Sequence, residues 1–190
     1  MTTTNLTTER LVLRMWSEEE RTAVLAVAVT ADGNGNADGE GEGERDGDGA
    51  GVTARRPAHW ADDFPDEGDR IIAEGLGRFP GWMGPHGHRQ IVERASGLVI
   101  GGVGLFWPPI EGEVEIGYGI VPSRQGRGYA TEAAIALTDF ALALPEVRTV
   151  YANVDLPNRA SVRVLVKADF RHWRTEGSTA SFRRGAASDR

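Results

Sequence analysis

Polar and hydrophobic residues alternate along several short stretches of the chain and recur at helical spacing along others. Alternation is typical of half-buried strands, and it predicts strands at residues 10–16, 89–95, 98–107, 113–121 and 148–154, with shorter candidates at 170–173 and 180–183. Apolar residues three and four positions apart, together with capping signals, predict helices at 17–29, 66–76, 129–142 and 157–168. Antiparallel hairpins come first and alternating strands and helices follow. This order predicts an α/β (α+β) fold in which a mixed sheet carries helices on both faces.

One segment departs from this pattern altogether. Residues 32–51 contain eight glycines, seven acidic residues and Arg45, so their net charge is −6. The whole chain of 190 residues carries −7, and the other 170 residues therefore sum to about −1. The segment has no apolar residue larger than alanine to offset the entropy of ordering so many glycines. We therefore expect a disordered acidic insertion within a single domain that spans residues 1–190.

Calcium binding by this insertion is a second interpretation. Asp32, Asn34, Asn36 and Asp38 alternate as in an EF-hand loop. The same register lacks the glycine that the turn of such a loop requires and the glutamate that completes its ligand set. A solvated acidic linker is therefore the better-supported interpretation.

Composition excludes several classes of chemistry. The chain has no cysteine, which rules out disulfides, thiolate zinc sites, iron–sulfur clusters and a cysteine nucleophile. Its acidity argues against nucleic acid as a partner, and no apolar run approaches the length of a membrane span. Residues 1–9 lack the pattern of a secretory signal. We therefore expect a cytoplasmic protein, a monomer or a homodimer, with no membrane and no nucleic acid among its partners.

The clearest chemical signal is a strand, a short loop and a helix between residues 115 and 134. A helix N-terminus has unpaired N–H groups and partial positive charge, which suit a phosphate. Gly126 and Gly128 allow backbone N–H groups to approach an anion, and Arg124 and Arg127 place cations beside it. The loop has neither a Walker motif nor a complete dinucleotide fingerprint. It therefore predicts a pyrophosphate cradle and disfavours a nucleotide-binding α/β protein.

The same loop resembles the motif of a known family. Gln125, Gly128 and Ala130 fall on the defined positions of the Q/R-x-x-G-x-G/A acyl-CoA loop of the GNAT N-acetyltransferase superfamily. The wider run at 115–133 is similar to the ribosomal-protein alanine acetyltransferase (RimJ/RimL-like) branch. A second block at 158–170 is similar to the N-x-x-S…K-x-G-F segment of that branch. The resemblance covers residues 6–182, apart from the insertion.

The resemblance implies a GNAT-like fold that uses acetyl-CoA as a co-substrate, with no metal. In that fold the sheet is mixed, mostly antiparallel and splayed, and the pantetheine arm lies in the gap beside strand 113–121. The coenzyme-binding residues that it implies are Gly119, Ile120 and Val121 for the arm, Gln125, Gly126, Arg127, Gly128, Tyr129 and Ala130 for the pyrophosphate, and Asn158 and Ser161 for the arm and the sulfur. Helix capping by Asn158 and a solvent-facing Ser161 are the structural alternatives.

One departure from the family pattern lies in the second block. Asp169 stands just past a helix end, where the family has glycine. Aspartate tolerates the left-handed conformation better than most residues. We therefore expect mild strain there.

The activity implied by the resemblance is transfer of an acetyl group to a primary amine by direct attack in a ternary complex. By the same resemblance, Glu115 would accept the proton of the amine and Ser161 would donate a proton to the departing thiolate. A surface carboxylate paired with an arginine is the alternative for Glu115. Tyr118 is another candidate acid, but alternation places it on the face opposite Glu115, so we expect it in the core.

The acceptor is left open between a protein N-terminus and a small-molecule amine. His59, Trp60, Asp62, Asp63 and Phe64 form an acidic, aromatic patch that suits a cationic amine, and local packing explains the patch equally well.

Two alternatives remain outside this interpretation. His86 and His88 flank a glycine in a predicted loop, where a two-histidine metal site is conceivable and solvated side chains are expected. A non-catalytic GNAT-fold module that binds acyl-CoA, acting as a sensor or an interaction partner, is the alternative to an enzyme.

Overall fold

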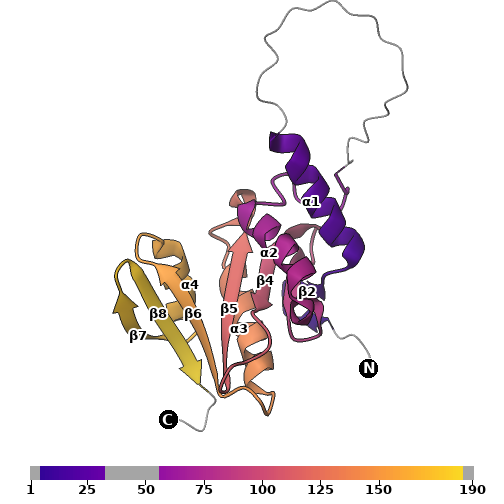
Figure 1. Ribbon diagram of the computed structural model, residues 1–190. Helices are drawn as coiled ribbons and strands as arrows, with labels where there is room; N and C mark the ends of the chain where they lie inside the picture. The colour runs from indigo at the N-terminus through magenta and orange to yellow at the C-terminus, as the bar shows by residue number, and fades with distance from the viewer. Residues whose placement is uncertain (1–4, 33–55, 186–190) are drawn as a thin grey trace, which may run out of the picture.

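The computed structural model describes residues 5–32 and 56–185. They form one eight-stranded sheet in the order β1-β2-β3-β4-β5-β6-β8-β7 (Figure 1). The strands are β1 (Leu6–Thr7), β2 (Leu11–Met15), β3 (His88–Glu93), β4 (Val99–Leu105), β5 (Glu113–Ile120), β6 (Thr149–Asp155), β7 (Arg171–Glu176) and β8 (Thr179–Gly185). The helices are α1 (Glu18–Asp32), α2 (Glu67–Arg78), α3 (Tyr129–Leu142) and α4 (Arg159–Lys167), with 3-10 turns η1 (Pro80–Met83) and η2 (Pro122–Arg124).

The strands and helices predicted from periodicity are present close to their predicted bounds. Three features differ from the prediction. β1 has only two residues, too few to alternate, and η1 lies within the predicted loop 79–87. The β7–β8 hairpin is longer than predicted. All six residues of β7 are exposed, so no alternation of buried and exposed positions marked the full strand. The predicted insertion at 32–51 and its calcium-binding alternative lie outside the described residues, apart from Asp32 at the end of α1.

The sheet splays between β5 and β6. Their parallel pairing joins Glu113–Glu115 only to Thr149–Tyr151, and β6 then pairs along its whole length with β8. Figure 1 shows the two strands close together where they begin and diverging toward their ends. The other neighbouring strands are antiparallel. The mixed, mostly antiparallel, splayed sheet is therefore confirmed.

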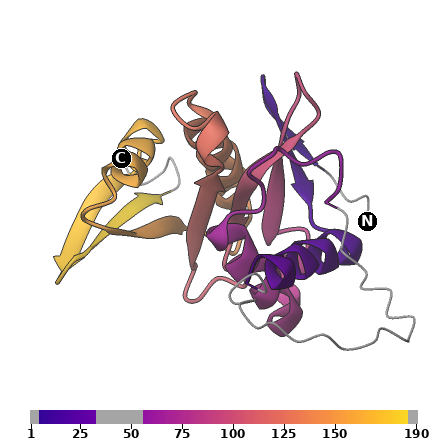
Figure 2. The same cartoon turned by 90° about the horizontal axis from the view of Figure 1, so that it is seen from above.

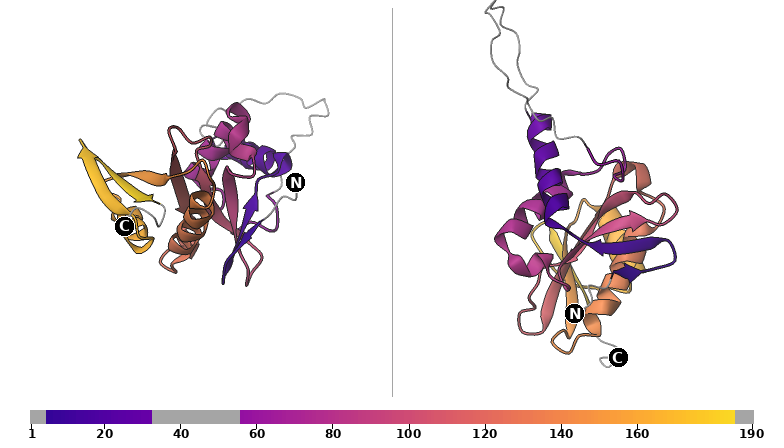
Figure 3. Two further views of the ribbon diagram at one scale, coloured as in Figure 1. Left: turned by 90° about the horizontal axis from the view of Figure 1, so that it is seen from below. Right: turned by 90° about the vertical axis from the view of Figure 1, so that its right-hand side faces the viewer.

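Helices cover both faces of this sheet, as predicted. Figure 2 shows α1 and α2 on one face and α3 and α4 on the other, and the left view of Figure 3 shows the same two layers from below. Ala133, Ala134 and Leu137 are fully buried on the inner side of α3, where small side chains allow the helix to approach the sheet closely. Among the described residues, no helix is long and apolar enough to cross a membrane.

Two single-residue predictions have clear outcomes in the fold. Asp169 follows α4 with φ of +63°, so the predicted left-handed conformation is confirmed. The expectation of a solvated loop histidine at position 88 is wrong. His88 begins β3, is only 3% exposed and packs against the rings of Trp82 and Phe106. The surrounding glycines and prolines suggested a loop, but the strand begins at His88, one residue before its predicted start.

Candidate functional site

A cleft of about 560 Å³ opens where β5 and β6 part. Its walls are the end of β5, the loop that follows, the first turn of α3 and the exposed side of α4. The predicted coenzyme residues that it brings together are Gly119, Ile120, Gln125, Gly126, Gly128, Tyr129, Ala130, Asn158 and Ser161. Val121 is fully buried and Arg127 is exposed, and neither lines the cleft.

The N-terminus of α3 forms the anion-binding end of the cleft. Gly128 precedes the helix with φ of +84°, a conformation that favours glycine. Glu132 N–H is the first to reach an acceptor in the helix, the carbonyl oxygen of Gly128 at 3.1 Å. The preceding N–H groups, those of Tyr129, Ala130 and Thr131, are the helix donors that lack an intrahelical partner, and all three residues line the cleft. Such a set of donors binds phosphate groups.

Hydrogen bonds brace the loop that leads into α3. The Gln125 side-chain amide donates to the Ile120 carbonyl oxygen at 2.8 Å, and its backbone N–H donates to Pro122 O at 3.2 Å. Asp63 accepts from both the backbone N–H and the hydroxyl of Ser123, each at 2.8 Å. Gln125 therefore fixes the loop against β5 with its side chain, and its own N–H is not available to a phosphate.

The peptide groups of β5 divide between β4 and the gap. The Gly119 carbonyl oxygen faces the Cα of Gly101 on β4, and Val121 N–H donates to Ile100 O at 3.0 Å. Because the backbone N–H and C=O of successive residues in a strand point to opposite edges, those of Tyr118 and Ile120 point toward the gap. Of the three predicted arm-binding residues, only Ile120 points there, with its N–H left for a ligand because its carbonyl oxygen accepts from Gln125. Tyr118 is the neighbour that sequence reasoning missed.

Tyr118 belongs to the core only in part, because it packs against the buried cluster but is itself half-buried. Its side chain is only partly buried, and its hydroxyl donates to the Ser161 carbonyl oxygen at 3.1 Å, across the gap from β5 to α4. Burial raises the pKa of the Tyr118 hydroxyl to about 12. The strand alternation was correct, and the end of this side chain is left partly open because β6 diverges from the edge of β5.

The predicted pair on α4 lies on the opposite wall of the cleft. Asn158 caps the helix, since its Oδ1 accepts from Ser161 N–H at 3.0 Å. Arg163 and Lys167 line the same cleft. These two cations stand four residues apart, and that spacing on helix 157–168 was the sequence signal that could have identified them.

Glu115 lies away from this constellation. Its Oε1 accepts a hydrogen bond from Asn153 Nδ2 at 3.1 Å, and it lines a separate cavity of about 360 Å³ together with Tyr151 and Ser181. Ser161 does not line that cavity. The structure thus does not place the two predicted catalytic residues in one cavity.

The aromatic patch at residues 59–64 is largely accounted for by packing. The buried rings of Trp60 and Phe64 meet edge to face, with centroids 5.0 Å apart. His59 and Trp60 bond the carboxylate of Glu20 at 2.7 Å and 3.1 Å. None of the patch lines the cavities described in this section.

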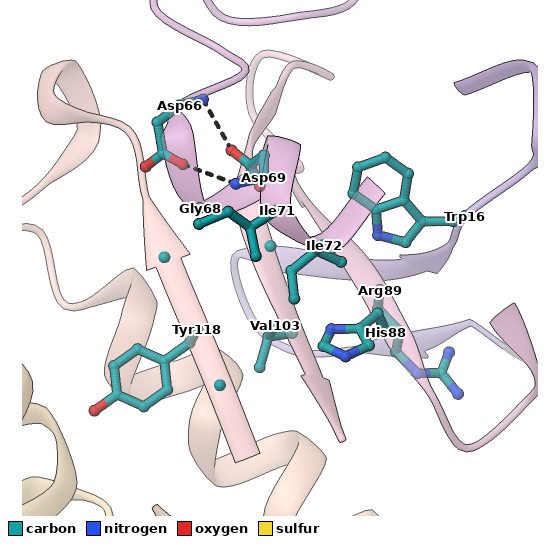
Figure 4. A pocket seen from close by; sticks show the side chains of 13 residues that line it. Trp16, Asp66, Gly68, Asp69, Ile71, Ile72, His88, Arg89, Val103 and Tyr118 are labelled. Atoms are coloured by element: carbon teal, nitrogen blue, oxygen red, sulfur yellow. Dashed lines mark hydrogen bonds between the residues drawn. The ribbon is translucent and has the colours of Figure 1, made fainter. Parts of the chain in front are cut away.

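Another cavity, of about 320 Å³ and called the second cavity below, lies under α2, on the sheet face opposite α3 (Figure 4). It shares Asp66, Tyr118 and Gly119 with the cleft, so the two spaces meet at the end of β5. Asp69, in the first turn of α2, lines it and is 5% exposed. Burial, reinforced by the neighbouring Asp66 carboxylate, raises the pKa of Asp69 to about 8.

His88 lines the other end of this second cavity, and burial lowers its pKa to about 4, so the imidazole is neutral at pH 7. His86 lies elsewhere, with its ring 4.5 Å from that of Trp107. In the part of the chain that the structure describes, no three histidine or acidic side chains gather as metal ligands would.

Comparison with known proteins identifies relatives in sequence and in fold. A family described as "Acetyltransferase (GNAT) domain" matches residues 10–171. The uncharacterized N-acetyltransferase YjdG of Bacillus subtilis is 31% identical over 93 residues, which are 44% of this chain and 55% of that protein. The aligned part of the chain thus spans about half the length of this curated relative.

Solved structures share the fold over almost the whole chain. A GNAT-family acetyltransferase from Bacillus anthracis superposes with a TM-score of 0.61 at 17% identity, covering 96% of this chain and 98% of its own. The ribosomal L7/L12 alpha-N-protein acetyltransferase RimL, solved with coenzyme A, superposes with a TM-score of 0.59 at 16% identity, covering 98% and 100%.

Proposed function

Because this chain belongs to the GNAT acetyltransferase family, we propose that it is an acetyl-CoA-dependent N-acetyltransferase that acts on a primary amine. The observation that carries the proposal is the cleft at the β5–β6 splay, which ends at the unpaired N–H groups of α3. A diphosphate fits such donors, and an extended arm fits a strand edge whose peptide groups are left without a neighbouring strand.

Each part of the coenzyme has a counterpart in the cleft. The N–H groups of Tyr129, Ala130 and Thr131 would bind the pyrophosphate, and Arg163 and Lys167 would supply cations for a further phosphate. The pantetheine arm would run along the backbone of Tyr118 and the N–H of Ile120, since the Ile120 carbonyl oxygen already accepts from Gln125. Asn158 and Ser161 would face the arm from α4, which leaves the thioester close to the hydroxyl of Tyr118.

The proposed reaction is direct acyl transfer. The nitrogen lone pair of a neutral amine attacks the thioester carbonyl carbon, the N–C bond forms, the C–S bond breaks and the thiolate takes up a proton. Ser161 is the donor proposed from sequence. The Tyr118 hydroxyl, with a pKa of about 12, stays protonated at neutral pH and is a second donor on the same wall. Glu115 is the base proposed from sequence, and its place in a separate cavity requires a relay through water.

The acceptor and the setting are also proposals. The name of RimL describes acetylation of a ribosomal protein, which favours a protein N-terminus as one acceptor class, and a small-molecule amine is the other. We propose that the protein works in the cytoplasm, as a single domain with an acidic insertion, as a monomer or a homodimer and without a metal. Nucleic acid and membranes are not among the proposed partners.

Calorimetric titration with acetyl-CoA, free CoA and NADH tests the proposal, followed by thiol release with a panel of amines. We expect micromolar binding of both CoA forms and none of NADH.

Gly128→Ala should weaken acetyl-CoA binding at least tenfold, because it strains the start of α3 and moves its N–H groups. Gly177→Ala is the matched control, since Gly177 also has positive φ but lies in the β7–β8 turn. A folded protein that binds no acetyl-CoA would overturn the proposal, and binding without turnover would indicate a non-catalytic acyl-CoA-binding module.

A further inference from the structure

We propose that the second cavity, under α2, is the acceptor site, and that it takes a small primary amine whose apolar body ends in a hydroxyl or carbonyl oxygen. The same proposal assigns the removal of the amine proton to the carboxyl pair Asp66–Asp69, in place of Glu115. It rests on the proposed function, because it names the acceptor of that reaction.

The position of the cavity suits an acceptor. Asp66, Tyr118 and Gly119 line both the cleft and the second cavity. These residues lie at the end of β5, where the thioester of the proposed coenzyme would lie. The two substrates would therefore enter from opposite faces of the sheet and meet at the splay.

The carboxyl pair forms the end of the cavity nearest the splay. Asp66 Oδ1 accepts from Asp69 N–H at 3.0 Å, and Asp69 Oδ2 accepts from Asp66 N–H at 3.2 Å (Figure 4). The other two oxygens turn toward the sheet: Asp69 Oδ1 lies 3.1 Å from where a Cβ on Gly102 would be, and Asp66 Oδ2 lies 3.8 Å from the same point on Gly119.

Gly102 and Gly119 are direct partners across the β4–β5 ladder. Two carboxyl oxygens therefore lie above one glycine pair, and a side chain on Gly102 would crowd the Asp69 oxygen. Cross-strand partners are about 5 Å apart, and two carboxyl oxygens over one such pair offer acceptors to an ammonium group. The arrangement recognises a primary amine.

The far end of the cavity offers two unpaired polar atoms. Trp16 and His88 are 5% and 3% exposed, and within the described residues neither the indole Nε1 of Trp16 nor the imidazole Nε2 of His88 has a hydrogen-bond partner. Figure 4 shows both rings on the side of the cavity away from Asp66 and Tyr118. An indole N–H can only donate, so the group that satisfies it is an acceptor such as a hydroxyl or carbonyl oxygen.

The middle of the cavity is apolar. Ile71, Ile72 and Val103 line it between the two polar ends, and Ile71, which is 61% exposed, lies at its rim. β3 and β5 flank β4, so the ends are about 10 Å apart, or two strand spacings. A peptide would bring an N–H and a C=O with each residue into this apolar stretch. A compact amine with one distal oxygen matches the lining better.

The local charges suit proton removal at Asp69. The titratable groups that line the same cavity are Asp66 at the N-cap of α2, His88 and Arg89 from β3, and Tyr118 from β5. The Arg89 guanidinium is bonded to the carbonyl oxygens of Leu13 and Pro85. The raised pKa of Asp69, about 8, lies close to neutral pH, where a general base works best. The ammonium proton passes to the Asp69 carboxylate, and the freed lone pair then attacks the thioester carbon.

The test compares tyramine with phenethylamine, which differs only by the distal hydroxyl, and with a short alanine-terminated peptide. We expect kcat/KM for tyramine to exceed that for phenethylamine by at least tenfold.

Trp16→Phe keeps an aromatic ring and removes the N–H, so it should abolish most of this preference. Asp69→Asn should lower kcat for tyramine at least a hundredfold and remove the rise of kcat with pH near 8. Glu67→Gln, an exposed neighbour on α2, should change neither.

Calorimetry with acetyl-CoA on each variant separates the two proposals. Unchanged acetyl-CoA binding, with peptide acetylated and tyramine not, would overturn the acceptor assignment and leave the proposed function intact. The same holds if Trp16→Phe retains the tyramine preference, or if Glu115→Gln and not Asp69→Asn removes the alkaline rise. Loss of acetyl-CoA binding in the unmodified protein would instead defeat the proposed function.

Discussion

Asp169 occupies a backbone conformation that costs other residues free energy. Its φ of +63° turns the chain directly after α4, and glycine reaches this region without a side-chain clash. Aspartate is among the more tolerant residues there, but it still carries a Cβ. The left-handed conformation at Asp169 therefore lowers the free energy of unfolding slightly.

Asp169→Gly should raise the free energy of unfolding by about 0.5 kcal/mol, the net of relieved strain and greater freedom in the unfolded chain. Asp169→Ala should lower it, because alanine keeps the Cβ and loses the local polar side chain. Urea denaturation of the two variants beside the unmodified protein measures both. A destabilised glycine variant would show that the aspartate side chain outweighs the strain.

His88 makes stability depend on acidity. Its folded-state pKa of about 4 lies below the ordinary 6.5, because burial disfavours the charged ring. Between these values the unfolded chain binds the extra proton, so the stability contributed by the neutral ring is lost as pH falls from 6.5 to 4. Asp69, with a pKa raised from 3.8 to about 8, has the opposite slope, and its contribution is lost as pH rises from 4 to 8.

The unfolding free energy of the unmodified protein should therefore fall, relative to that of His88→Asn, by up to about 3 kcal/mol between pH 6.5 and 4. His86→Asn serves as the control and should keep the unmodified slope. Denaturation series at several pH values provide the comparison, in which the opposite contribution of Asp69 is common to both proteins and cancels. Parallel curves for the unmodified protein and His88→Asn would mean that water reaches the ring.

At the scale of elements, α3 is held to the sheet edge at its first turn. Glu132 accepts from the Thr8 hydroxyl at 2.5 Å, from Arg10 N–H at 2.9 Å and from Arg10 Nε at 2.7 Å. Arg10 also donates to the Arg127 carbonyl oxygen at 2.9 Å. The turn between β1 and β2 therefore fixes both the helix and the loop that presents its N–H groups.

Glu132→Gln should lower the free energy of unfolding by about 1 kcal/mol, a value reduced for the solvent exposure of Arg10. It should also weaken acetyl-CoA binding several-fold, because the loop loses part of its support. Thermal unfolding and calorimetry measure the two effects, with exposed Glu19→Gln on α1 as the control. Unaltered binding would show that Asp63 and Gln125 are sufficient to hold the loop.

Local sequence determines most of these elements but not how they meet. Alternation located β5, and glycine spacing located the start of α3, because both are properties of a few consecutive residues. The cavity under α2 depends on Trp16, Asp69, His88 and Gly102, which come from four segments, and no local pattern brings them together. For the same reason Tyr118 was placed in the core, since its exposure depends on the divergence of β6.

At the scale of the whole molecule, the splay divides the sheet into two parts that are joined by a short parallel ladder at Glu113–Glu115. β1 to β5 form one antiparallel part, and β6, β8 and β7 form the other. The cleft between them is lined by α3 on one side and α4 on the other. A ligand in the cleft contacts both parts.

Acetyl-CoA at a hundred times its dissociation constant should stabilise the folded protein by about 2.7 kcal/mol. For a chain of this size, that corresponds to a rise in Tm of roughly 5–10 °C. Thermal unfolding with and without acetyl-CoA measures the rise, NADH should produce none, and Gly128→Ala should reduce it. An unchanged Tm would be incompatible with tight binding to the folded state.

The short ladder also suggests how the protein could be divided by design. The chain passes between the two parts once, through α3 and the turn that ends at β6, and each part keeps its own antiparallel hydrogen bonds. Two polypeptides separated at residues 143–148 would need to recover only the ladder and the helix contacts to reassemble. A ligand that spans the cleft would favour their association, so the split protein would serve as a reporter whose complementation rises with ligand concentration.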